Sequence, residues 1–295
     1  MSAYRIAVAL ILMVSSMLAQ SEDTRSEPEI TLSLKLIAAD VQSVLVQEQL
    51  NNAYDVFARL SEHGLTWQPS LLAPNDLAGR LDDEQLRMYA GIKLFDAIYA
   101  ATFRQPKVVA EAVAVIEAVH NRLDLRSAAD MSGALLTVLG RAAADPSGVD
   151  LDKTFGDLAA GLIKDVPVLM SSPQGADYLV DSLFGFWLQQ TFMRIRLHAL
   201  AQQVGDFTLD RGALAQPDRG EWETAMLTLL KAMAPLDQTP TIPGSSIGKV
   251  DLIAETLAAY QADTTPEGTA ATWAQWGKLE AETTAARAAI LTPGH

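Results

Sequence analysis

The sequence predicts an all-α protein, a multi-helix antiparallel bundle or a stack of helical hairpins with about nine helices around one hydrophobic central helix. From position 32 onward, apolar residues recur at three- and four-residue spacing, and no segment keeps the alternation typical of a strand. Apolar residues make up 49% of the 295 positions and charged residues 20%, which is enough to build a large core. Most connections between the periodic segments are short, so sequential helices are expected to be antiparallel neighbours.

The first nineteen residues have the pattern of a secretory signal peptide. Arg5 is the only charge before an apolar run at positions 6–18, and the run is followed by Ala19, Gln20 and an acidic segment. This run is 13 residues long, shorter than the roughly 20 residues that span a bilayer, so we expect cleavage after Ala19 and no stable membrane span afterwards, although an uncleaved anchor stays open. The expected location is therefore periplasmic or secreted.

Composition indicates the covalent chemistry and the net charge that the exported chain would have. It contains no cysteine, which excludes disulfides and a lipid-modified cysteine at the cleavage site. The formal net charge is −14, from 36 acidic and 22 basic residues, and loss of one arginine with the signal changes it to 21 − 36 = −15. The acidic excess is scattered and no Lys/Arg cluster exists, so nucleic acid is not an expected partner.

After the signal, residues 20–31 are predicted to be a flexible acidic leader, and residues 32–295 to form the helical domain. Proline marks the first helical position at Pro106, Pro173 and Pro266. The longest irregular segments are residues 205–220 and 236–248, and the first is where the domain would divide if there are two. The predicted helices are 32–63, 83–103, 106–123, 127–144, 151–165, 173–204, 221–235, 248–262 and 266–291.

The helix at 173–204 is predicted to be the central one, because it is hydrophobic on nearly every side. The helix at 83–103 is its expected partner. Small residues on that helix leave little bulk between two helix axes and permit a close approach; they are Gly91, Ala97, Ala100 and Ala101.

Two motifs known from metal sites and catalytic sites occur without the other residues that those sites require. Glu117 and His120 form one Glu-x-x-His, but a carboxylate-bridged metal bundle needs a second copy, so no metal site is predicted. The segment 244–248 reads Gly-x-Ser-x-Gly without a preceding strand or a suitable later histidine, so no catalytic residue is predicted. No phosphate-binding glycine loop is present, and no cofactor is expected.

Two polar residues interrupt the apolar helix at 83–103. Lys93 and Asp96 are three positions apart, and the first expectation is a solvated intrahelical ion pair. The alternative is an Asp96 that is desolvated against the central helix and anchors a ligand inside a pocket, with Tyr99 nearby on the same helix.

A polar sector on the helix at 173–204 is the second half of the candidate pocket. It contains Asp181, Gly185, Gln189 and Arg196, which fall on one side at 100° per residue. Gly185 lowers helix stability and is expected to permit close approach of a helix or ligand. The structural alternative is a buried polar network that links two helices.

The function predicted from these patterns is that of a non-enzymatic exported protein. It would bind a small ligand or an envelope partner in a groove between the helices at 83–103 and 173–204. The alternative is an envelope scaffold or oligomeric interaction protein without a small-molecule pocket. The candidate binding residues are Asp96, Tyr99, Asp181, Gly185, Gln189 and Arg196.

Overall fold

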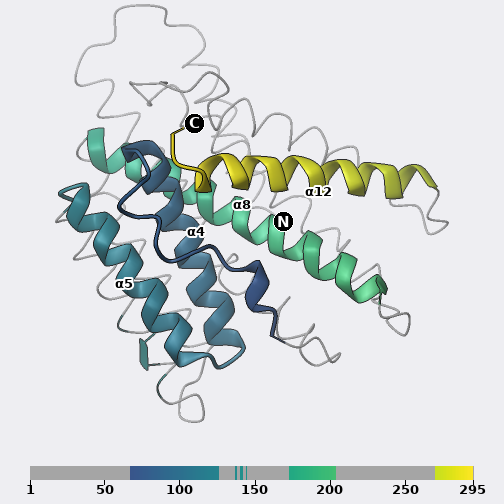
Figure 1. Cartoon of the computed structure of the whole chain (residues 1–295), viewed down its shortest axis with the longest axis horizontal. Helices are drawn as coiled ribbons and strands as arrows, with labels where there is room; N and C mark the ends of the chain where they lie inside the picture. The colour runs from purple at the N-terminus through teal and green to yellow at the C-terminus, as the bar shows by residue number, and fades with distance from the viewer. Residues whose placement is uncertain are drawn as a thin grey trace, which may run out of the picture.

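A computed structural model describes residues 67–125, 173–203 and 270–294, together with the single positions 137, 140, 141 and 144. This part contains four α-helices, one short 3-10 helix and no strand, which confirms the all-α prediction for it (Figure 1). None of its helices is long and apolar enough to cross a membrane. The expected signal peptide, the expected leader and the expected helices at 32–63, 151–165, 221–235 and 248–262 lie outside the described residues. So does the expected helix at 127–144, apart from the four single positions, which are helical.

Helix α4 (Asp83–Thr102) begins at a reciprocal cap that the sequence analysis missed. The Asp82 carboxylate accepts a hydrogen bond from the Gln85 amide (2.8 Å), and the Gln85 side chain accepts one from the Asp82 amide (3.3 Å). The helix ends where Arg104 adopts a left-handed conformation (φ 55°) and the Gln105 amide donates back to the Ala100 carbonyl. These local signals fix the ends of α4 close to the predicted bounds.

Helix α5 (Pro106–Arg122) forms a hairpin with α4. Pro106 occupies the start of the helix, as predicted. The N–H groups of the first turn make no hydrogen bond within a helix, so the N–H that proline lacks is not missed there. The three-residue connection 103–105 returns the chain alongside α4. One face of α5 is buried, through Val109, Ala112, Val115, Ile116 and Val119.

Helix α8 (Pro173–Gln203) crosses α4 so closely that the two backbones touch. A Cβ atom added to Gly91 would lie 1.8 Å from the Ser182 carbonyl oxygen, and one added to Gly185 would lie 1.9 Å from the Met88 carbonyl oxygen. The predicted pairing of these helices, and the close approach of a helix at both glycines, are confirmed. In the described part α4 contacts three helices, α5, α8 and α12, and is buried on nearly all sides.

Helix α12 (Ala270–Leu291) runs antiparallel to α8, and its C-terminal end reaches the N-terminal end of α4 (Figure 1). The Gln85 side chain donates there to the carbonyls of Ala289 and Thr292, both at 3.0 Å. These bonds satisfy carbonyl groups that have no partner within the last turn of a helix. The predicted start at Pro266 lies outside the described residues.

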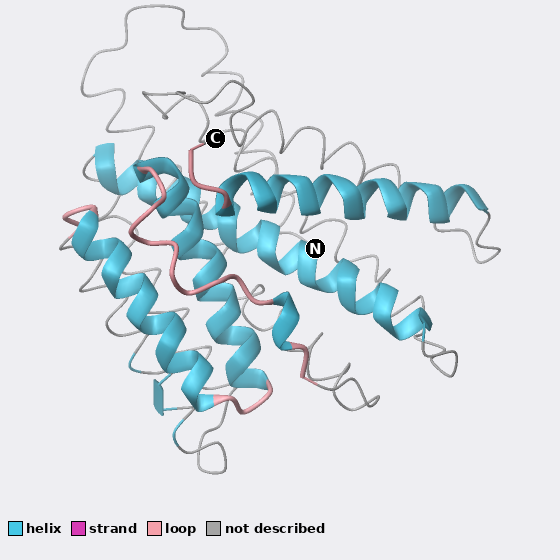
Figure 2. Cartoon of the chain, in the orientation of Figure 1, coloured by secondary structure: helices cyan, strands magenta, loops and turns pink. Residues whose placement is uncertain are grey.

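The segment before α4 is irregular and crosses the face of that helix (Figure 2). It includes the 3-10 helix η1 (Pro69–Leu71) and continues through turns to Asp82. Its apolar side chains are buried against the helices, namely Leu71, Ala73, Leu77 and Leu81. Extended backbone that is buried in this way needs partners for its peptide groups, and these partners are side chains.

Candidate functional site

The main chain of the segment before α4 is held by polar side chains of the helix. We call residues 68–75 the strap. Its peptide groups bond four side chains of α4: Gln68 N–H donates to the Tyr99 hydroxyl (3.1 Å), Ala73 N–H donates to Asp96 (3.0 Å), Ala73 C=O accepts from Lys93 (3.1 Å), and Pro74 C=O accepts from Tyr89. Helix α4 thus supplies the partners that a sheet would give to extended backbone.

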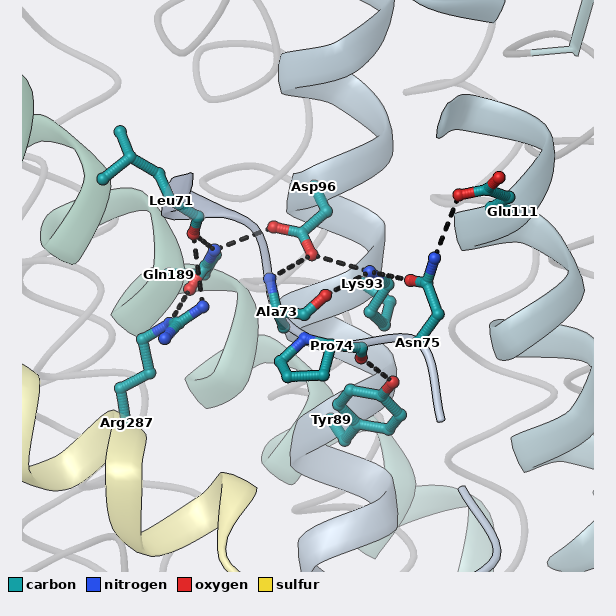
Figure 3. A network of polar contacts seen from close by, with 10 residues as sticks. All are labelled: Leu71, Ala73, Pro74, Asn75, Tyr89, Lys93, Asp96, Glu111, Gln189 and Arg287. Atoms are coloured by element: carbon teal, nitrogen blue, oxygen red, sulfur yellow. Dashed lines mark hydrogen bonds and ion pairs between the residues drawn. The ribbon is translucent and has the colours of Figure 1, made fainter. Parts of the chain in front are cut away.

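Lys93 and Asp96 form the centre of this site (Figure 3). Their side chains are 1% and 0% exposed, and Lys93 Nζ lies 2.9 Å from Asp96 Oδ2. The expectation of a solvated ion pair is therefore wrong, because the strap and the neighbouring helices cover this face of α4. Lys93 also donates to Asn75 Oδ1 (2.7 Å), so its three protons have three acceptors.

Gln189 and Arg287 extend the network to α8 and α12. The Gln189 amide nitrogen donates to Asp96 Oδ1 (2.8 Å) and to the Leu71 carbonyl (3.1 Å). Arg287 donates through Nε to Gln189 Oε1 (2.6 Å) and through Nη2 to the same Leu71 carbonyl (3.2 Å). Its guanidinium also lies over the ring of Phe192, 4.5 Å from the centroid. Three helices and the strap therefore meet at Asp96, Gln189 and Arg287.

Burial perturbs the ionisable groups at this junction. Desolvation raises the pKa of the Asp96 carboxyl, while the charge and hydrogen bond of Lys93 and the donated Ala73 N–H oppose that shift. Desolvation lowers the pKa of the Arg287 guanidinium, and the charge of Asp96 opposes it. Asp96 accepts hydrogen bonds from Ala73 N–H, Lys93 and Gln189, a pattern that fits the ionised carboxylate.

The structure brings together only two of the six candidate binding residues, Asp96 and Gln189. Tyr99 lies one turn further along α4, where Trp67 stacks on its ring with a centroid distance of 4.8 Å. Burial raises the pKa of Tyr99 to about 12, with the Gln68 hydrogen bond acting in the opposite direction. The hydroxyl of Tyr99 thus holds the strap at its other end.

The remaining candidates on α8 have separate neighbours. Asp181 Oδ2 accepts from Arg87 Nε of α4 at 2.7 Å, and Gly185 packs on the α4 backbone. Arg196 faces α12, where its Nη1 lies 2.5 Å from Glu280 Oε1. For Asp181 and Gln189 the structure matches the alternative of polar links between two helices.

The Glu-x-x-His pair of α5 is divided between surface and core. Glu117 is exposed, whereas His120 is buried and its Nε2 lies 2.6 Å from the Tyr178 hydroxyl of α8. Burial lowers the pKa of His120 to about 4, so the imidazole is neutral at pH 7. Within residues 67–125, 173–203 and 270–294, no group of three or more His, Asp and Glu side chains is placed to hold a metal ion.

Sequence reasoning missed the contributions of Arg287, Asn75 and the strap main chain. Arg287 lies 98 residues from Gln189 and 216 from Leu71, and no periodicity connects positions so far apart. The only signal was an arginine within an alanine-rich stretch of the last helix. Asn75 carries the network on to α5, because its amide donates to Glu111 at 3.1 Å.

Chemically, this arrangement binds polypeptide main chain. Its polar side chains supply donors and an acceptor to peptide groups, and each is engaged within the protein. Comparison of the chain with protein-family models, with curated proteins and with solved structures gives no match. The interpretation of the site rests on its own geometry.

Proposed function

We propose that the chain is an exported, non-enzymatic helical protein that acts by binding a protein partner. This is the interaction-protein alternative of the sequence analysis. The observation that supports it is that the polar side chains of the site are already hydrogen-bonded within the protein. They bond one another and the strap, and they are Lys93, Asp96, Gln189 and Arg287. A site that holds a small polar ligand would instead direct some of these groups toward the ligand.

Packing between the two central helices supports the same preference. The proposed small-ligand groove lies between α4 and α8, but at Gly91 and Gly185 the two backbones are in direct contact. A ligand there would have to separate helices whose facing side chains are buried, among them Phe95 and Phe186. Protein binding through outer helix faces requires no such separation.

Export is part of the proposal, through the signal at residues 1–19. The test is to express the full chain in a bacterial host, isolate the envelope fraction and sequence the N-terminus of the product. Cleavage after Ala19 with release of soluble protein supports export, and retention of the intact N-terminus in the cytoplasm contradicts it.

The interaction function is tested by multi-angle light scattering of the processed chain over a hundredfold range of concentration. A dimer or larger assembly, or a stable complex isolated from envelope extract and identified by mass spectrometry, supports the proposal. A monomer at every concentration, with no complex and with a reproducible thermal shift from a small molecule, would replace it with the ligand-binding alternative.

A further inference from the structure

Arg287 of α12 engages the protein with only one edge of its guanidinium. Its Nε donates to Gln189 Oε1 (2.6 Å) and its Nη2 donates to the Leu71 carbonyl (3.2 Å), as Figure 3 shows. A guanidinium has a second edge, at which Nη1 and Nη2 each carry an N–H group on the side away from Nε. Nη1 forms no hydrogen bond in the part of the chain that the structure describes. We call this second edge the Arg287 fork.

The Arg287 fork has a fixed direction and is open to solvent. The two hydrogen bonds orient the guanidinium, and the ring of Phe192 covers one of its faces, with the ring centroid 4.5 Å from Cζ. Among the described residues, the buried side-chain polar atoms without a partner are Trp187 Nε1 and Gln190 Oε1, and Nη1 of Arg287 is not one of them. Water therefore reaches Nη1, and a polar group from another molecule can reach it too.

Arg287 also has no carboxylate partner of its own. Three other arginines in the described residues form ion pairs with a carboxylate, namely Arg80, Arg87 and Arg196. No described carboxylate forms an ion pair with Arg287. The Asp96 carboxylate acts on it from beyond ion-pair distance and is already paired with Lys93 at 2.9 Å.

The junction of the strap with α8 and α12 therefore holds a positive charge that is not balanced. Lys93 and Arg287 are both cations, and Asp96 is the single carboxylate between them. Removing a charge from water is costly unless the charge is paired, and desolvation lowers the pKa of the Arg287 guanidinium for this reason. An anion that binds the Arg287 fork offsets part of that cost, whereas a fully solvated arginine gains little from pairing.

The nearest described neighbours of the Arg287 fork carry no charge. Residues three positions before and four positions after an arginine share its side of a helix, and the two residues that precede Leu71 adjoin the carbonyl that bonds the guanidinium. These neighbours are exposed or partly exposed, and they are Thr284, Leu291, Pro69 and Ser70. An incoming anion therefore meets one oriented cation without a competing acidic side chain beside it.

We propose that the protein partner binds at the Arg287 fork through the carboxylate of an exposed Asp or Glu side chain. The inference rests on the proposed interaction function and gives the chemistry of its partner. A carboxylate accepts two parallel hydrogen bonds from Nη1 and Nη2, which fixes the direction of approach and adds the attraction of opposite charges. The uncharged neighbours of the fork then contact the residues on either side of that acidic side chain.

The net charge of the chain favours an isolated carboxylate over a polyanion. The formal charge is −14, from 36 acidic and 22 basic residues, so a nucleic acid or an anionic membrane is repelled over its whole length or area. At 0.15 M salt the Debye length is about 8 Å, so distant charges have little effect on a single carboxylate that is in contact with the fork.

The first part of the test measures carboxylate binding on the parent chain, with acetate as the probe. Acetate replaces chloride at a constant ionic strength of about 0.1 M, and NMR follows the Nε and Nη signals of isotope-labelled arginine side chains. The Arg287 signals, assigned by through-bond correlation to the backbone, should shift and saturate with a dissociation constant on the order of 10 mM. Arg87 and Arg196 are controls in the same sample, because their guanidinium groups already pair with Asp181 and Glu280.

The second part measures the affinity of the complex or assembly that the parent chain forms. Arg287→Lys keeps the charge but not the fork, and it should weaken that affinity by about tenfold or more. Gln85→Ala is the matched control, because it also removes hydrogen bonds that dock α12, to Ala289 and Thr292, but leaves the Arg287 fork in place. It should change the affinity by less than about threefold. Circular dichroism checks that both variants fold, and the acetate titration depends on neither of them.

Three outcomes overturn the inference. If the Arg287 signals do not saturate, or if those of Arg87 and Arg196 shift equally, the fork is an ordinary solvated cation. If acetate binds but Arg287→Lys forms the complex as tightly as the parent chain, the partner binds elsewhere and the interaction function stands. If the parent chain is monomeric at every concentration and envelope extract gives no complex, the interaction function fails, and the inference fails with it.

Discussion

Replacing Gly185 by alanine should separate α4 from α8 and destabilise the fold. The new Cβ would lie 1.9 Å from the Met88 carbonyl oxygen, whereas real contacts of this kind are no shorter than 3.0 Å, so the backbones must move apart by about 1.1 Å. A gap of 0.5–1 Å forfeits about a quarter to a half of each dispersion contact. The interface beside it includes the edge-to-face pair of Phe95 and Phe186, with centroids 5.2 Å apart.

Substitutions that remove much of a core contact cost about 3 to 5 kcal/mol, and we expect the separation of α4 from α8 to lower the free energy of unfolding by a similar amount. Alanine regains about 1 kcal/mol of helix propensity relative to glycine, so the net loss is about 2 to 4 kcal/mol. Gly277→Ala in α12 is the matched control, because that glycine is exposed and its Cβ would have nothing within 4 Å. It should stabilise the protein by about 0.5 to 1 kcal/mol.

Urea unfolding followed by far-UV circular dichroism measures both variants against the parent chain. A loss for Gly185→Ala together with a gain for Gly277→Ala isolates the steric effect from helix propensity. If Gly185→Ala is as stable as the parent, the direct backbone contact of α4 and α8 is not a feature of the folded protein.

Three further predictions concern charge, pH and backbone conformation. Lys93→Met leaves the buried Asp96 carboxylate without its ion-pair partner and should lower the free energy of unfolding by about 3 to 5 kcal/mol. The double variant K93M/D96N should regain part of this loss. Equal urea midpoints of Lys93→Met and the parent chain would refute this prediction. The pKa of His120 is about 4 in the folded state and about 6.5 in the unfolded state, so the unfolded chain binds more protons at any pH between 4 and 6.5. The free energy of unfolding should therefore fall by up to about 3 kcal/mol as the pH drops from 6.5 toward 4. Urea titrations at pH 7 and 4.5 should show this slope in the parent and a flatter one in His120→Gln. Arg104 has φ 55° after α4, so Arg104→Gly should raise the melting temperature by relieving about 0.5 to 1 kcal/mol of strain, and a lowered one would contradict the assigned conformation.

Helix bounds and helix pairing were predictable because their signals are local. Pro106 begins α5, and α8 begins at Pro173, as expected. Gly91 and Gly185 indicated a close approach from residue size alone, and the partner could be inferred because few helices are apolar on all sides. The capping box at Asp82 was equally readable and was overlooked.

The composition of the site was harder to predict because helical position alone does not identify a neighbour. Gln189 and Arg196 are seven residues apart and project in nearly the same direction, but they are separated by about 10 Å along the axis. Gln189 therefore meets α4 and the strap, while Arg196 meets Glu280 on α12. Likewise, the spacing of Lys93 and Asp96 indicates an ion pair but not the segment that buries it.

Gln189 makes the position of α12 dependent on the position of the strap. Its amide nitrogen donates to Leu71 and Asp96, its oxygen accepts from Arg287, and Arg287 in turn donates to the same Leu71 carbonyl. Displacement of α12 removes Arg287 from the buried Gln189 oxygen, and loss of that donor costs about 1 to 3 kcal/mol. The buried Gln189 side chain therefore has partners for both its nitrogen and its oxygen only while α12 is docked.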